Sequence, residues 1–140
     1  PDTIRSRTLN SLDAIDRDAW TALPGAQYPF LRHDFLSNLE QHDCLGQKTG
    51  WIPAHKVFET AEGQLVAGVP MYVKSNSFGE FVFDWAWANA YHHHGIEYYP
   101  KLVIASPFTP ATGPRIRISE PYRSEQMRKK VIRAVIEEAA

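Results

Sequence analysis

The sequence contains a single cysteine, Cys44, among its 140 residues. An intrachain disulfide and a zinc site built from several thiolates are therefore excluded, and a reducing compartment, the cytoplasm, is the expected location. Long apolar stretches are also missing, because no run approaches the roughly 20 residues that span a bilayer. We expect no membrane span.

Positive and negative side chains are also nearly equal in number. The chain has 15 Lys and Arg residues against 16 Asp and Glu residues, a formal net charge of −1. This balance argues against unspecific attraction to nucleic acid or anionic membrane, so no DNA partner is expected. The chain is 44% hydrophobic and 12% aromatic. That composition suffices for one domain with a core, but 140 residues are too few for two full domains.

Helical spacing of apolar residues predicts two helices in the first third of the chain. The first covers residues 12–23, with Ser11 and Asp13 as candidate N-caps. The second covers residues 34–45, and Gly46 is expected to end it.

The central part of the chain has a strand pattern. Strands are predicted over residues 54–59, 64–74, 80–83, 101–106 and 115–118. A tight turn at residues 60–63 joins the first two as a hairpin. Since proline cannot donate to a ladder, the second strand should be bulged or at an edge near Pro70.

Two further helices complete the pattern. Asp84 is the expected N-cap of one, which Gly95 ends, and the other runs from about residue 122 to the last residue. Basic residues come early in the final helix and Glu137 and Glu138 come last, which opposes the helix dipole. Because no capping residue closes it, we expect the native chain to continue. The order of elements predicts a mixed α/β sheet flanked by helices.

The most specific signal lies in residues 75–115. The motifs are SNSFGEFVFDWAWA at 75–88, YYPKL at 98–102, PFTP at 107–110 and TGPR at 112–115, with PFL at 29–31 and TGWIPAH at 49–55 upstream. Together they resemble the FemAB-like family of peptidoglycan biosynthesis or recognition proteins, assigned to the GNAT superfamily. The resemblance covers the chain from about residue 28 onward.

The resemblance implies one GNAT-like domain over residues 1–140, with a mixed, largely antiparallel sheet flanked by helices. It also implies that this domain is the N-terminal half of a longer protein with a second GNAT-like half. Family members resemble aminoacyltransferases that extend peptidoglycan precursors, so acyl or aminoacyl transfer is the implied activity. This half would recognise the acceptor, a cell-wall precursor or peptide. The alternatives are a non-catalytic recognition domain and a structural support for a catalytic C-terminal half.

No cofactor is expected in this part of the protein. A GNAT acyl-CoA site needs backbone N–H groups of a glycine-rich turn at a helix N-terminus. The corresponding connection, residues 107–114, has three prolines, which lack that donor. The resemblance therefore leaves aminoacyl-tRNA or acyl-CoA as a donor for the full-length protein. Separated from its other half, the domain would expose an apolar surface and self-associate as a homo-oligomer.

No catalytic residue can be named from the sequence, but a substrate-binding rim can. Its candidates are Trp85, Trp87, Tyr98, Tyr99, Lys101, Thr109, Thr112, Gly113 and Arg115. Trp85 and Trp87, two residues apart, cannot share a helical face, and they either form a sugar- or peptide-binding wall or fill the core while Asp84 caps the helix. Arg115 either clamps a carboxylate or phosphate or belongs to a self-bonded loop and pairs with a surface acid.

The three consecutive histidines at 92–94 are not expected to bind metal. Successive helical side chains diverge by about 100°, so three in a row cannot converge on one ion. A solvated C-terminal turn of a helix is the preferred interpretation.

Overall fold

A long antiparallel hairpin organises the fold in the computed structural model, which describes residues 3–140. Strands β3 (His55–Glu59) and β4 (Leu65–Val69) form its closed end, and the predicted turn joins them. Strands β2 (Trp51–Pro53) and β5 (Met71–Lys74) form its open end and also pair antiparallel. The hairpin prediction is confirmed, although β2 was not expected as a strand.

The two ends of the hairpin belong to different sheets. The larger sheet has the order β1 (Arg5–Leu9), β3, β4, β7 (Arg117–Ile118), and the smaller has the order β2, β5, β6 (Lys101–Ile104). The chain changes sheet at Ala54 on one arm of the hairpin and at Pro70 on the other. Pro70 lacks the N–H that a continuous ladder would need. The predicted irregularity at Pro70 is therefore confirmed, and residues 64–74 form two strands instead of one.

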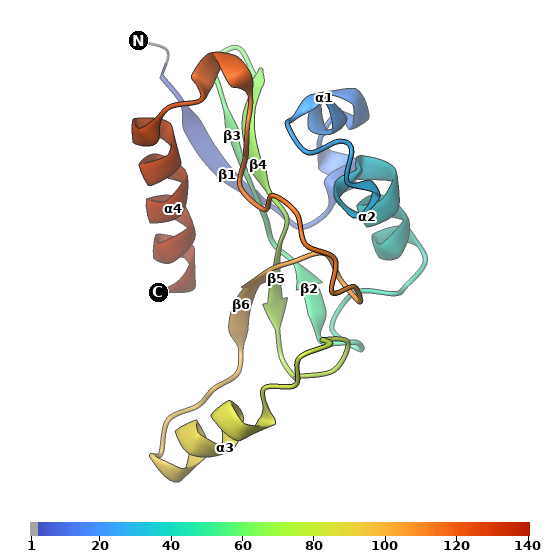
Figure 1. The fold of residues 1–140 in the computed structure, drawn as a ribbon, viewed down its shortest axis with the longest axis vertical. Coiled ribbons are helices and arrows are strands. Elements are labelled where there is room, and N and C mark those ends of the chain that lie inside the picture. Colours follow the sequence, from blue (N-terminus) through green and yellow to red (C-terminus); the bar gives the residue numbers. More distant parts are fainter. Residues whose placement is uncertain (1–2) are drawn as a thin grey trace.

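Helices cover both faces of the larger sheet (Figure 1). Helices α1 (Arg17–Ala22) and α2 (His33–Gln41) lie on one face, and α4 (Glu125–Ala139) lies on the other. This arrangement confirms the predicted mixed α/β class with antiparallel sheets flanked by helices. Within residues 3–140, no helix is both long enough and apolar enough to cross a bilayer.

Neighbouring residues of β3 pack in two separate hydrophobic cores, because side chains alternate between the two faces of a strand. Val57 packs in one core with Trp20 and Leu36, on the side of α1 and α2. Phe58 packs in the other with Met127 of α4. All but Met127 are fully buried, and Met127 is nearly so.

The first predicted helix is divided in two. Ser11 caps a short 3-10 turn at Leu12–Ala14, as expected. Helix α1 then begins at Arg17, and the Asp16 carboxylate accepts the Ala19 N–H at 2.8 Å. Asp13 is therefore not an N-cap, because its carboxylate accepts hydrogen bonds from side chains of α2 instead.

Two other predicted boundaries are wrong. Helix α2 ends at Gln41, and Asp43, with φ 56°, is the left-handed residue that follows it, so Gly46 does not end the helix. Residues 80–83 form no strand, because no neighbouring strand is available to pair with them and three of these four side chains are exposed. The prediction of a strand failed because a run of aromatic residues is typical of strands but is also found in this exposed segment.

Candidate functional site

Residues 75–100 form an arm that projects from the smaller sheet and carries α3 (Trp85–His93) (Figure 1). The arm connects β5 to β6, whose residues Lys74 and Lys101 are direct partners in the ladder. We call residues 75–100 the α3 arm. Both of its ends are thus fixed by neighbouring strands.

Asp84 anchors the arm to its own base. Its carboxylate accepts hydrogen bonds from the Ser77 hydroxyl and the Lys101 ammonium group, and it lies 3.1 Å from the Tyr99 hydroxyl. Lys101 Nζ also lies 3.0 Å from Oε2 of Glu80. Only 10% of the Asp84 side chain is exposed. We call these five residues the Asp84 network. It joins the start of the arm, the segment before α3, the end of the arm and β6.

The ion pair in this network stays charged at neutral pH. Burial raises the pKa of Asp84, but hydrogen bonds from Lys101 and Ser77 outweigh it and hold that pKa well below its usual range. Burial lowers the pKa of Lys101, but hydrogen bonds to Asp84 and Glu80 raise it above its ordinary value. Neither group exchanges a proton near neutral pH, so the pair acts as an anchor.

The expectation that the Asp84 side chain caps α3 is wrong. Asp84 occupies the N-cap position, but its carboxylate makes no capping hydrogen bond. A charged ammonium group is a stronger partner for a carboxylate than a backbone N–H. The helix itself, with Gly95 at φ 70° after its end, is confirmed.

A second lysine holds the first loop of the arm. Lys74 is fully buried, and its Nζ lies 2.6 Å from the Phe78 carbonyl oxygen and 4.2 Å from the centroid of the Trp51 ring. Trp51 Nε1 donates to the same carbonyl at 3.0 Å. Burial lowers the pKa of Lys74 below its ordinary value. Two buried donors therefore fix the position of Phe78.

A groove of about 420 Å³ lies between this loop and α3. We call it the α3 groove, and its lining residues are Ser75, Asn76, Ser77, Phe78, Trp85, Ala88, Asn89 and Tyr99. Trp85, Ala88 and Asn89 share one face of α3, because they are three and four residues apart. Ser77 and Tyr99 belong to the Asp84 network, so part of the groove is rigidly held.

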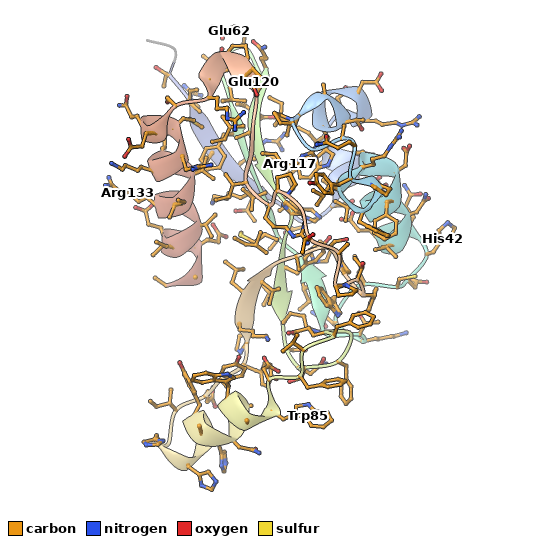
Figure 2. All side chains as sticks on the ribbon, in the orientation of Figure 1. His42, Glu62, Trp85, Arg117, Glu120 and Arg133 are labelled. Atoms are coloured by element: carbon orange, nitrogen blue, oxygen red, sulfur yellow. The ribbon has the colours of Figure 1, made fainter. Side chains whose placement is uncertain are left out.

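Both tryptophans of α3 are exposed, Trp85 at 55% and Trp87 at 66%. The interpretation that they fill the core is therefore wrong. Figure 2 shows Trp85 on the flank of the arm, pointing away from the rest of the molecule. Phe83 stacks on Trp85, with ring centroids 4.9 Å apart and ring planes 29° apart. Of the two tryptophans, Trp85 lines the α3 groove and Trp87 does not.

The structure divides the nine predicted rim residues into two groups, five on or at the base of the arm and four elsewhere. Besides Trp85 and Trp87 on α3, the first group contains Tyr98, Tyr99 and Lys101 at the base of the arm, where Lys101 Nζ is 5.5 Å from the Tyr98 ring centroid. The other four residues belong to the loop between β6 and β7 and do not line the α3 groove: Thr109, Thr112, Gly113 and Arg115.

Arg115 donates hydrogen bonds within its own loop. Its guanidinium group lies 2.6 Å from the Ala111 carbonyl oxygen and 3.3 Å from that of Gly113. Gly113 lies against the Tyr28 ring, since a Cβ added there would be 3.1 Å from it. The role of Arg115 in ligand binding stays a prediction.

Two buried polar residues that the sequence did not single out are structural. His55 Nε2 lies 2.6 Å from Glu40 Oε1, and its Nδ1 accepts the Met71 N–H at 3.2 Å. Both ring nitrogens are thus occupied, and the ring holds α2 against the hairpin. Because His55 has no exposed surface, it cannot serve as a general base for a bound ligand.

Arg117, labelled at the centre of Figure 2, joins β7 to the segments around α1. Its guanidinium group donates to the carbonyl oxygens of Leu23, Pro24 and Leu31 at 2.7 to 3.1 Å. It also lies 5.4 Å from the Trp20 ring centroid. Burial lowers the pKa of Arg117 to about 10.

A larger hollow, of about 630 Å³, lies at the start of α4. Its charged lining residues are Arg123, Glu125 and Arg128, all exposed at the surface. Arg123 pairs with Glu120 and Glu125 with Lys129, both along the chain. The α3 groove is the stronger candidate, because nearly buried polar groups converge on it from separate segments.

The three histidines are exposed at the C-terminal end of α3, as expected for a solvated helix end. His94 Nδ1 lies 2.7 Å from the Ala90 carbonyl oxygen. In the part of the chain that the structure describes, no three His, Cys, Asp or Glu side chains are grouped so that they could hold a metal ion.

Residues 11–140 match the model of the FemAB-like family, described as peptidoglycan biosynthesis/recognition. No curated protein and no solved structure matches the chain.

Proposed function

Because this chain belongs to the FemAB-like family of peptidoglycan biosynthesis and recognition proteins, we propose that it recognises the acceptor of an acyl- or aminoacyltransferase. The acceptor is a cell-wall precursor or a peptide derived from one. The observation that carries this proposal is the α3 groove, whose lining contains the exposed Trp85 and two residues of the Asp84 network, Ser77 and Tyr99.

The combination of residues that line the groove supports ligand binding. A binding site usually combines aromatic surface with a few fixed polar groups. Trp85 supplies the surface, and Ser77 and Tyr99 are fixed by hydrogen bonds to the Asp84 carboxylate. Such pre-ordered groups lose little conformational freedom when a ligand binds.

The chemistry of the groove favours recognition over bond making. Asp84 is ionised and holds Lys101, so it cannot also accept a proton from an attacking amine. The buried His55 belongs to another part of the fold. We therefore place the transfer step, with aminoacyl-tRNA or acyl-CoA as donor, in a second GNAT-like half of a longer protein.

A second candidate function is docking without any part in transfer. The arm exposes several large apolar side chains beyond Trp85: Phe81, Val82, Phe83, Trp87 and Ile96. Exposed apolar surface of this kind is typical of protein–protein contacts. Its partner would be the C-terminal half of the same protein or a second copy of this chain.

Calorimetry with the full-length protein and a soluble cell-wall precursor tests the proposal. Trp85→Ala should weaken binding roughly tenfold, a loss of about 1.4 kcal/mol, because it removes the aromatic wall. Trp87→Ala is the matched control, since Trp87 is also exposed on the same helix but lies outside the groove. Equal affinity of the wild type and Trp85→Ala would refute acceptor recognition at this groove.

A further inference from the structure

The residues that line the α3 groove carry no charge. All eight are Ser, Asn, Phe, Trp, Ala or Tyr. The charges beside the groove balance: Asp84 and Glu80 carry two negative charges, and Lys101 and Lys74 carry two positive ones. Lys101 is held by the two carboxylates, and the buried Lys74 Nζ lies 2.6 Å from the Phe78 carbonyl oxygen. A groove that binds a carboxylate or phosphate usually presents Arg, Lys or free backbone N–H groups. The α3 groove therefore fits a neutral, hydroxyl-rich ligand better than an ionic one.

Trp85 supplies the aromatic surface of the groove. Phe83 stacks on Trp85 with ring planes 29° apart, so it covers part of one face of the indole. The indole is nevertheless 55% exposed and lines the groove. A flat indole face against a groove suits the apolar C–H face of a pyranose ring, which buries carbon surface while its hydroxyl groups point to the sides.

Amide and hydroxyl groups lie beside this ring. Asn89 is on the same face of α3 as Trp85 and is exposed, and its side chain makes no hydrogen bond within residues 3–140. On the opposite wall, Asn76 Oδ1 accepts the Phe78 N–H at 3.0 Å, which fixes the orientation of its amide group. An amide carries both donors and an acceptor, so it can pair with a sugar hydroxyl or with an acetamido group.

We propose that the α3 groove binds an N-acetylated sugar ring, with Trp85 as its stacking platform and Asn89 as its polar contact. This inference rests on the proposed acceptor recognition and specifies which part of the acceptor enters the groove. The sugar is the neutral portion of a cell-wall precursor, and its charged peptide lies outside the groove.

The test is a titration of the full-length protein with N,N′-diacetylchitobiose, cellobiose and a synthetic stem peptide without sugar. Binding is followed by calorimetry, because an emission signal from Trp85 would be lost in the Trp85 variants themselves. The diacetylated disaccharide should bind and cellobiose should bind more weakly. Trp85→Phe should retain part of the affinity, and Trp85→Ala and Asn89→Ala should each lose roughly tenfold.

Trp87→Ala is the matched variant and should bind the disaccharide like the wild type. Binding of the stem peptide without binding of the disaccharide would overturn the sugar assignment and leave acceptor recognition standing. Loss of affinity in Trp87→Ala equal to that in Trp85→Ala would overturn it as well, because the contact would then be unspecific. If neither the peptide, nor the disaccharide, nor the intact precursor binds, both proposals fail.

Discussion

Asp84 and Lys101 form an ion pair at the base of the α3 arm, and both side chains are largely shielded from solvent. The pair links the first residue before α3 to the first residue of β6, so it holds the helix against the sheet from which the arm projects. Glu80 is a second acceptor for the same ammonium group. The position of α3, one wall of the α3 groove, depends on this contact.

Removing Lys101 should destabilise the arm more than removing Asp84. Lys101→Ala leaves the Asp84 and Glu80 carboxylates without their shared cation, whereas Asp84→Asn leaves Lys101 with Glu80. Breaking a buried pair costs about 3–5 kcal/mol, and partial exposure reduces this to about 1–3 kcal/mol here. Urea unfolding monitored by circular dichroism measures the difference.

Arg123→Ala is the control for this comparison. The pair of Arg123 with Glu120 is well exposed, so its loss should cost less than about 1 kcal/mol. A Lys101→Ala protein as stable as the Arg123→Ala protein would contradict the role of the Asp84 network.

The arm should weaken in acid. The pKa of Asp84 is lowered in the folded protein, so the folded state resists protonation more than the unfolded chain does. The stabilisation from this carboxylate is therefore complete above about pH 4, the usual pKa of Asp, and is lost as the pH falls below it. The pKa of Lys101 is raised, so its contribution is lost only as the pH rises above about 10.

The measurement compares the unfolding free energy of the wild type with that of Asp84→Asn between about pH 6 and pH 2. The difference should shrink steadily below about pH 4, because Asn cannot be protonated in this range. A difference that stays constant over the whole range would show that the Asp84 pKa is not shifted.

Arg117 should not be replaceable by lysine. Its guanidinium group donates to three carbonyl oxygens from one planar fork, and the single ammonium nitrogen of lysine cannot reach all three. Arg117→Lys should lower the unfolding free energy by about 2–4 kcal/mol, since buried carbonyl oxygens lose their partners. Thermal unfolding measures this, and a shift no larger than that of the exposed Arg128→Lys would contradict it.

Gly68 should not tolerate a side chain. A Cβ added there would lie 2.7 Å from the Trp20 ring, which is fully buried between β4 and α1. Gly68→Ala should cost about 1–3 kcal/mol through overpacking. Gly63→Ala is a useful contrast, because no atom lies within 4 Å of its added Cβ and only its positive φ opposes the change. Trp20 emission during unfolding follows both variants.

The sequence predicted the parts of the fold that depend on local chemistry. Proline at position 70 and the turn at residues 60–63 act on their immediate neighbours, so the hairpin and its interruption could be foreseen. The same applies to the ends of α3. The passage of the chain from one sheet to the other at Pro70 could not be foreseen, because it depends on which distant strands complete each sheet.

The candidate site, like the fold, could be predicted from the sequence only where local chemistry decides. The sequence shows that the arm is rich in aromatic residues. It does not show that these residues are exposed, because Trp and Phe are usually buried in a core. Asp84 looks like a helix cap when only its neighbours are considered. Its true partner, Lys101, is distant in sequence and becomes adjacent only when β5 and β6 pair.

The most direct test of acceptor recognition is an NMR titration of the full-length protein with a soluble cell-wall precursor. The largest shifts should fall on the Trp85 indole N–H and on the side-chain amides of Asn76 and Asn89, which line the α3 groove. Shifts concentrated instead at Arg123 and Arg128, in the hollow at the start of α4, would contradict it.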